Sequence, residues 1–127
     1  MQVFDMHHGI TVLMGKENVV ASGVVDGEII DTAGYESLEF IFQAGATVTV
    51  APTLTLEHGD ESDLSDATEV DAEEVLGTLV QVEAADDVGK VGYIGKERYV
   101  RVAQSAGNAI YGIVAVLGTA HHQPTDD

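Results

Sequence analysis

Apolar and polar residues alternate with a period of two through much of the chain. In "YESLEFIF", Leu38, Phe40 and Phe42 share one face, which predicts a strand with that face toward a core. "TVTVAPTLTLE" alternates in the same way. Pro52 within it indicates an edge position or a bulge, because proline cannot donate to a ladder. "ERYVRVA" alternates again, and "NAIYGIVAVLG" is apolar enough for a largely buried last strand.

Turn signals separate these stretches about every 8 to 12 residues. Asp26-Gly27, between "GVV" and "EII", predicts a hairpin, and Gly34 predicts the next turn. A short helix is expected only between Leu64 and Leu76, with Ser65 or Asp66 as its cap. We therefore predict an all-β fold, a single antiparallel β-sandwich or barrel of jelly-roll or β-tulip type, with at most one short helix.

The length of 127 residues suits one domain. We expect an extended N-terminal arm at residues 1–16, the β domain at 17–120 and a polar tail at 121–127. The arm is too apolar for a purely solvated end. It forms either a strand of the domain's own sheet or an arm that orders on a neighbouring subunit. The candidate contact residues in it are Val3, Phe4, Ile10, Val12 and Leu13.

The charge balance excludes several classes of partner. Five basic against 22 acidic residues give a formal net charge of −17. Binding to nucleic acid or to anionic membranes requires clustered cations, so neither is expected. The absence of cysteine excludes disulfides, thiolate metal sites and cysteine nucleophiles. No apolar run approaches the roughly 20 residues that span a bilayer, and no basic secretory start is present, so the protein is expected to stay where it is made.

The segment Glu57–Glu74 contains nine acids and no base. EF-hand spacing fails in both registers, because Leu64 or Ala67 falls at a position that needs an oxygen ligand. We predict a solvated acidic loop between two strands. A calcium site of another kind, formed by Asp60, Asp63 and Asp66, is the alternative.

The histidines do not form a recognisable centre. His7-His8 and His121-His122 are adjacent pairs, whose side chains point to opposite faces on a strand. His58 stands near many acids, but no nucleophile elbow, phosphate loop or metalloprotease motif occurs. We predict that the protein is not an enzyme and uses no metal or cofactor.

Four of the five basic residues lie close together in the sequence: Lys90, Lys96, Arg98 and Arg101. They do not form a continuous basic patch on a strand. Two alternatives remain open. Arg98 and Arg101 pair with the acidic loop of their own chain, or they meet acids of a neighbouring subunit.

The order of several phrases resembles a known class of virion protein. These phrases are "DTAGYESLEFIFQAG", "LEHGDESDLSDATEV" with "VLGT", "VGYIGKERYVRV" and "AVLGTAHHQP". Over roughly Ile29 to Pro124 they resemble the small capsid decoration, cement or stabilising proteins of tailed bacteriophages. The "ESD" turn followed by "RYVRV" is also similar to discoidin-type jelly rolls, but the aromatic residue that usually follows the turn is missing.

The resemblance to decoration proteins implies a small β-rich domain that sits as a homotrimer on the outer capsid surface. It implies binding to the major capsid protein at capsomer junctions after assembly in the host cytoplasm, often through a terminal arm. A head–tail joining or tail subunit is the first alternative. A carbohydrate-binding jelly roll displayed on the virion is the second, and it would need exposed aromatic platforms.

Overall fold

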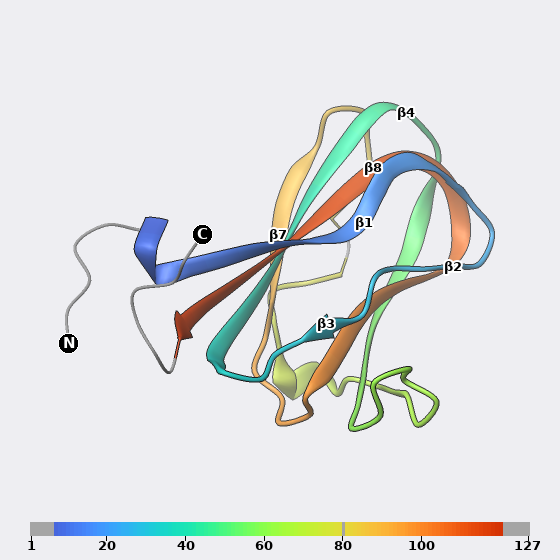
Figure 1. Cartoon of the computed structure of the whole chain (residues 1–127). Helices are drawn as coiled ribbons and strands as arrows, with labels where there is room; N and C mark the ends of the chain where they lie inside the picture. The colour runs from blue at the N-terminus through green and yellow to red at the C-terminus, as the bar shows by residue number, and fades with distance from the viewer. Residues whose placement is uncertain (1–6, 80, 121–127) are drawn as a thin grey trace.

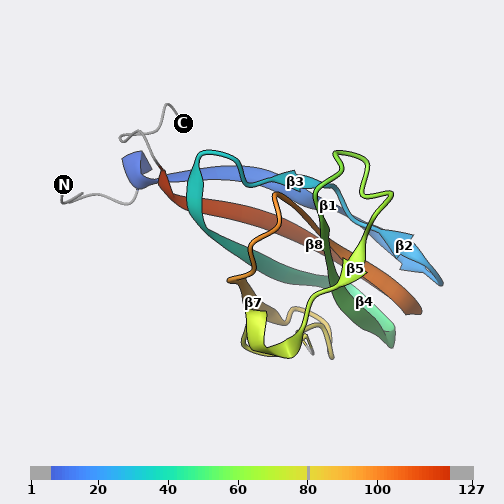
Figure 2. The same cartoon turned by 90° about the horizontal axis from the view of Figure 1, so that it is seen from below.

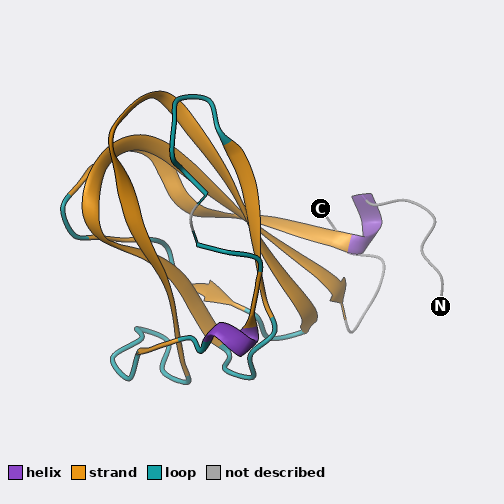
Figure 3. Ribbon diagram, turned by 180° about the vertical axis from the view of Figure 1, so that it is seen from behind, coloured by secondary structure: helices purple, strands orange, loops and turns teal. Residues whose placement is uncertain are grey.

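The structure is a computed structural model that describes residues 7–79 and 81–120. Strands make up most of it, with two short 3₁₀ turns (Figure 3). The elements are η1 (His7–Gly9), β1 (Ile10–Ser22), β2 (Val25–Asp26), β3 (Ile30–Asp31), β4 (Tyr35–Gly59), β5 (Thr68–Glu69), η2 (Ala72–Glu74), β6 (Val75–Leu76), β7 (Val88–Tyr93) and β8 (Tyr99–Ala120). No helix within the described ranges is long and apolar enough to cross a membrane.

All strands belong to one antiparallel sheet with the order β1-β8-β4-β7-β6. β2 and β3 continue along β8 beyond the end of β1, and β5 pairs with the end of β4. The sheet is open, with β1 and β6 at its two ends. The predicted all-β antiparallel fold is confirmed.

Two long strands bend the sheet over itself. β4 and β8 pair along their whole lengths, and the register between them shifts repeatedly from Ala44 to Leu54. Each shift places extra residues on one strand, which bends it and increases its twist. Pro52 lies in this segment, so the predicted bulge is confirmed. The bend is visible in Figure 1, where both strands curve at the same end of the molecule.

The concave side of this bent sheet holds the core. Leu38, Phe40 and Phe42 all point into it, as the alternation in β4 predicted. Leu79 and Val82 join the core from a segment without strand structure. The same cluster includes Leu54, Leu56, Val91, Tyr93, Val100, Val102, Tyr111, Ile113, Ala115 and Leu117. The two halves of each long strand therefore contribute to one core.

The predicted hairpin at Asp26-Gly27 is wrong. β2 and β3 do not pair with each other, because both pair with β8 one after the other. Between them the Gly27 amide donates to the Val102 carbonyl at 2.8 Å, and the Glu28 amide donates to the Gly15 carbonyl at 2.7 Å. The long edge of β8 offers more hydrogen bonds than a two-residue turn, so the chain stays extended here.

The expected helix is reduced to one turn. Ala72–Glu74 forms the 3₁₀ turn η2, preceded by Asp71, whose side chain makes no capping hydrogen bond. Ser65 and Asp66 lie in an earlier turn and do not cap it. The predicted turn at Gly34 is confirmed, with φ of 90° and a hydrogen bond from the Tyr35 amide to the Thr32 carbonyl.

Candidate interaction surfaces

The expected N-terminal arm is described from residue 7 onward. Its last part, from Ile10, lies in β1 and pairs with β8 of the same chain. Ile10 is half-buried, whereas Val12 and Leu13 are 50 % and 40 % exposed. Val3 and Phe4 lie outside the described residues. In Figures 1 and 2, this half of β1 and the end of β8 extend together from one side of the body.

An exposed apolar face surrounds this part of β1. Met14 lies opposite Val114 of β8, and Val114 lies opposite Ile41 of β4. These three side chains, Val12 and Lys16 are among the residues that line a shallow hollow of about 380 Å³. Met14, Ile41 and Val114 were not among the predicted contact residues. The available signal was an apolar residue at the solvent-facing position of an alternating strand.

Both predicted arginines have partners within the chain. The Arg98 guanidinium makes a bidentate pair with the Asp31 carboxylate, with both hydrogen bonds at 2.8 Å. Hydrogen bonding from Arg98 lowers the pKa of Asp31, and the same pair raises the pKa of Arg98. Arg98 also lies over the Tyr99 ring, 5.0 Å from its centre. Asp31 lies outside the acidic loop, so sequence proximity did not reveal this pair.

Arg101 is less exposed than Arg98, and it offsets the repulsion between two glutamates. Glu57 of β4 and Glu69 of β5 lie directly opposite each other, an arrangement in which like charges destabilise a sheet. Arg101 lies opposite Glu57 on the other side, and its Nε donates to Glu57 Oε1 at 2.8 Å. Its Nη1 lies 3.7 Å from Asp26 Oδ2. Whether either arginine also contacts another subunit stays a prediction.

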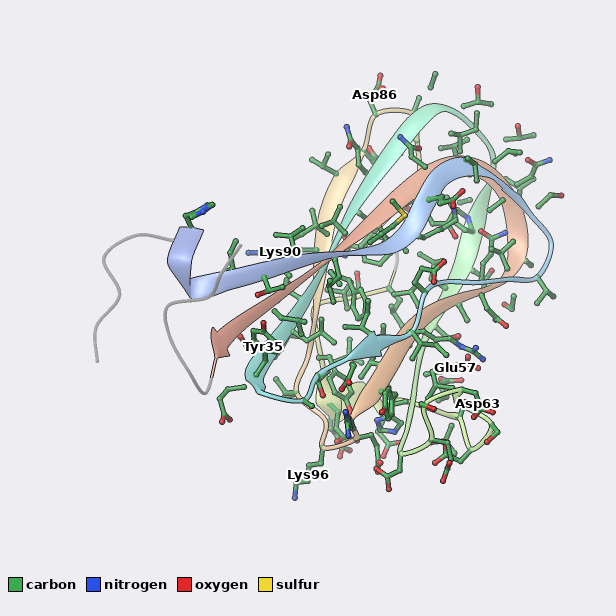
Figure 4. All side chains as sticks on the ribbon, viewed as in Figure 1. Tyr35, Glu57, Asp63, Asp86, Lys90 and Lys96 are labelled. Atoms are coloured by element: carbon green, nitrogen blue, oxygen red, sulfur yellow. The ribbon has the colours of Figure 1, made fainter. Side chains whose placement is uncertain are left out.

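Only part of the acidic segment Glu57–Glu74 forms a loop. β4 runs to Gly59 and β5 begins at Thr68, so the loop spans residues 60–67. Its acidic side chains are exposed, and Leu64 anchors it in the protein with 4 % exposure. Figure 4 shows Glu57 and Asp63 at this end of the molecule and Asp86 at the opposite end.

Two aspartates organise the loop by accepting hydrogen bonds from its backbone. The Asp66 carboxylate accepts from the amides of Asp60 and Glu61 at 2.9 and 3.3 Å. Asp63 Oδ1 accepts from the Ser65 amide at 3.0 Å. These bonds lower the pKa of Asp66 and Asp63. In the described part of the chain, no three acidic or histidine side chains gather in a way that could hold a metal ion.

His58 belongs to a small polar network beside this loop. Its Nδ1 lies 2.8 Å from Tyr93 Oη, which also accepts a hydrogen bond from the Glu97 amide at 3.0 Å. Burial raises the pKa of Tyr93. A hydrogen bond with the Asp60 side chain is the largest cause that raises the pKa of Glu97. The network fixes the 93–97 turn against β4, and Tyr93 is the hydrogen-bond partner of His58 among the described residues.

The fold has a counterpart among solved structures. No family model matches the chain, and no curated protein matches it. The crystal structure of the SPBc2 prophage-derived protein YomS is similar, with a TM-score of 0.53 and 11 % sequence identity. The match covers 85 % of this chain and 91 % of that one. At this identity the likeness concerns the fold, which the two chains share over most of their lengths.

Proposed function

We propose that this chain is a structural protein of a tailed-bacteriophage virion. In this role it decorates and stabilises the outer capsid surface by binding the major capsid protein at capsomer junctions. The observation that carries the proposal is the shared fold with a prophage-derived protein over most of both chains. The order of sequence phrases from residue 29 to 124, which resembles decoration proteins, supports it.

The surface chemistry is consistent with a binding role that involves neither nucleic acid nor membrane. The net charge of −17 disfavours contact with packaged or free nucleic acid. His58 hydrogen-bonds with the Tyr93 hydroxyl, Asp66 accepts from the Asp60 amide, and Glu57 accepts from Arg101. We assign no catalysis, metal or cofactor to the protein. We propose that it assembles in the host cytoplasm as a homo-oligomer, most simply a trimer.

A carbohydrate-binding role is less consistent with the aromatic side chains. Sugar platforms are aromatic faces open to solvent. Among the described residues, four aromatic side chains are buried and two are half-buried. The half-buried Tyr35 is held by a 2.7 Å hydrogen bond between its hydroxyl and the Thr11 hydroxyl. A head–tail joining or tail subunit remains the alternative role within a virion.

The stoichiometry in purified particles tests the proposal. Quantitative mass spectrometry should find this chain in an amount comparable to that of the major capsid protein. A small fixed number of copies per particle would identify the head–tail or tail role instead. Absence from purified particles would refute a virion role altogether.

The N-terminal arm gives a second test. β1 begins at Ile10, so a chain lacking residues 1–9 keeps every described strand. If the arm clasps the capsid protein, this truncated chain should fold normally and bind decoration-free capsids more weakly. Unchanged capsid binding would show that Val3 and Phe4 are not contact residues.

A further inference from the structure

A tyrosine hydroxyl fixes the turn that follows β7. The Glu97 amide donates to Tyr93 Oη at 3.0 Å, so the turn folds back over the tyrosine side chain. A Cβ added at Gly95 would collide with that oxygen, so the turn closes tightly over it. Figure 4 shows Lys96 of this turn and Glu57 of β4 at the same end of the molecule. The position of the turn therefore depends on what the Tyr93 hydroxyl binds on β4.

The geometry determines where the hydroxyl hydrogen of Tyr93 points. A phenol has one hydrogen to donate, and its oxygen can accept. The oxygen accepts from the Glu97 amide, and its other partner in the described part of the chain is His58 Nδ1, at 2.8 Å. The hydroxyl therefore donates its hydrogen to His58 Nδ1. This arrangement requires a neutral imidazole that carries its own hydrogen on Nε2.

A protonated ring cannot keep this arrangement. An imidazolium carries a hydrogen on both nitrogens, so Nδ1 becomes a donor and no longer accepts from Tyr93. The Tyr93 oxygen would then face two donors, and its own hydrogen would lose its acceptor. Tyr93 is buried, with 5 % exposure, so the loss of that acceptor costs free energy. Histidine is also the side chain whose ordinary change of charge falls between pH 5 and 8.

Acidic side chains beside His58 offer its charged form another partner. The pKa of Glu97 is raised most by a hydrogen bond with the Asp60 side chain, while the charge of His58 lowers it and that of Asp66 raises it. These three carboxylates therefore lie within electrostatic reach of the ring. Glu74 adds a fourth negative charge, which acts on Tyr93.

The strands on either side of His58 place uncharged side chains opposite it. Thr68 of β5 and Val100 of β8 are its cross-strand partners. The two nearby cations lie after β7: Lys96 is exposed, and Arg98 is held in its carboxylate pair. Because the backbone of His58 is paired on both sides, a change of charge acts through its side chain.

We propose that His58 is a pH-sensitive switch that sets the position of the 93–97 turn. The neutral ring accepts from Tyr93 and holds the turn on β4. The protonated ring releases Tyr93, pairs with the carboxylates of Asp60 and Glu97, and leaves the turn free to move away from β4. The switch couples pH to the shape of the acidic end of the molecule, and it does not depend on the role proposed above.

The first test determines the protonation state of the ring in the full-length chain. Nitrogen NMR of the histidine side chains at about pH 7.5 should show His58 with its hydrogen on Nε2 and with Nδ1 as an acceptor. The signal of His58 is the one that disappears in His58→Asn. A neutral ring with its hydrogen on Nδ1 would overturn the proposal, and this measurement needs only the parent chain to be folded.

The second test follows the turn by hydrogen–deuterium exchange, with rates corrected for the intrinsic effect of pH. Protection of the Glu97 amide should fall by about fivefold or more between about pH 7.5 and pH 5.5, as expected for one lost hydrogen bond. The Gly23 amide is the internal control. It donates to the Gly107 carbonyl, so its protection should not change.

His58→Asn is the matched variant. Asparagine Oδ1 can accept from Tyr93 in place of Nδ1 and gains no proton in this pH range, so protection of the Glu97 amide should be equal at both pH values. A fall that persists in this variant would come from the Asp60–Glu97 carboxyl pair and would refute the role of His58. Equal protection in the parent chain at both pH values would refute it as well. None of these outcomes bears on the copy number in virions.

Discussion

At the scale of single residues, Lys16 is the one charged side chain that is buried among those described. It sits in a bulge of β1, where the register with β8 shifts on both sides of it. Its ammonium donates to the carbonyls of Glu17, Val19 and Tyr111 at 2.9, 3.2 and 2.7 Å. It also lies 4.1 Å from the centre of the Tyr111 ring. Lys16 therefore closes the bulge and ties it to β8.

Replacing Lys16 with methionine keeps the length of the side chain and removes the ammonium. We expect Lys16→Met to lower the free energy of unfolding by about 2 to 3 kcal/mol, because three carbonyl oxygens lose a charged donor. Lys90→Met, at an exposed position of β7, should change it by less than about 0.5 kcal/mol. Urea denaturation measures both. Equal effects would show that the Lys16 contacts do not stabilise the fold.

Tyr111 and Gln104 form a buried polar pair on β8. The Tyr111 hydroxyl donates to Gln104 Oε1 at 2.6 Å. The Gln104 amide donates to the carbonyls of Gly23 and Ala21 at 2.9 and 3.3 Å. Burial raises the pKa of Tyr111 from its ordinary 10.0 to about 12. The pair connects the end of β1 with β8.

This raised pKa predicts a loss of stability at alkaline pH. Between pH 10 and about 12 the unfolded chain releases the Tyr111 proton while the folded chain keeps it. The stabilisation is therefore complete below pH 10 and is lost as pH rises toward 12. Tyr111→Phe should be less stable at pH 7, by about 1 to 3 kcal/mol, since Gln104 loses a donor. Its stability should also fall less steeply above pH 10. If the stabilities of the parent chain and of Tyr111→Phe fell equally steeply above pH 10, the raised pKa of Tyr111 would be contradicted.

Sequence patterns predicted residue environments only where they repeat locally. Leu38, Phe40 and Phe42 were placed correctly, because alternation within one strand determines which side faces the core. The burial of Lys16 was not foreseen, because its acceptor on Tyr111 lies 95 residues away. Such contacts depend on the register between strands, which no local pattern specifies.

At the scale of elements, the bend in β4 and β8 depends on one close approach. Gly107 of β8 has φ of 130°, and a Cβ added there would lie 2.6 Å from the Cα of Pro52 in β4. Its carbonyl also accepts a hydrogen bond from the Gly23 amide at 3.0 Å. Period-two patterning predicted strands on either side of this bend. It did not show that the segments on the two sides are joined into the continuous strands β4 and β8.

A pair of alanine substitutions separates backbone strain from steric clash at this bend. Gly34 also has a positive φ, of 90°, but a Cβ there would meet nothing within 4 Å. We expect Gly34→Ala to cost about 1 kcal/mol from strain alone. Gly107→Ala should cost about 3 kcal/mol, because its Cβ also collides with backbone. Thermal denaturation gives both values. Equal losses would mean that β4 moves away from the added Cβ without a further loss of stability.

Two aspartates of the acidic loop allow a comparison between variants that have the same net charge. Asp60→Asn and Asp66→Asn each remove one negative charge. Asp66 accepts two backbone hydrogen bonds, whereas the Asp60 side chain lies against Glu97 and raises its pKa. We therefore expect Asp60→Asn to raise the melting temperature and Asp66→Asn to lower it. The lowered pKa of Asp66 means that its contribution is present above pH 3.8 and is lost as pH falls below that value.

At the scale of the whole molecule, the acidic side chains are unevenly distributed over the fold. Composition predicted a strongly acidic surface, and the acids do gather in the 60–67 loop and its surroundings. The exposed apolar face of Met14, Val114 and Ile41 could not be predicted in the same way. It forms because β8, the last strand, inserts between β1 and β4, and this places the three side chains opposite one another. Val12 and Leu13 of β1 were candidate contact residues from the sequence, but Met14 and its neighbours on β4 and β8 were not.

The net charge predicts how the whole protein responds to salt. Acidic side chains repel one another within the folded state, and at physiological ionic strength screening acts over about 8 Å. We expect the melting temperature to rise with NaCl. CaCl₂ at the same ionic strength should give no additional rise specific to the loop, because the carboxylates of Asp63 and Asp66 accept backbone amides. Calorimetry on the parent chain and on the triple variant Asp60→Asn, Asp63→Asn, Asp66→Asn tests this. A large calcium-dependent rise that disappears in the triple variant would instead identify the loop as a metal site.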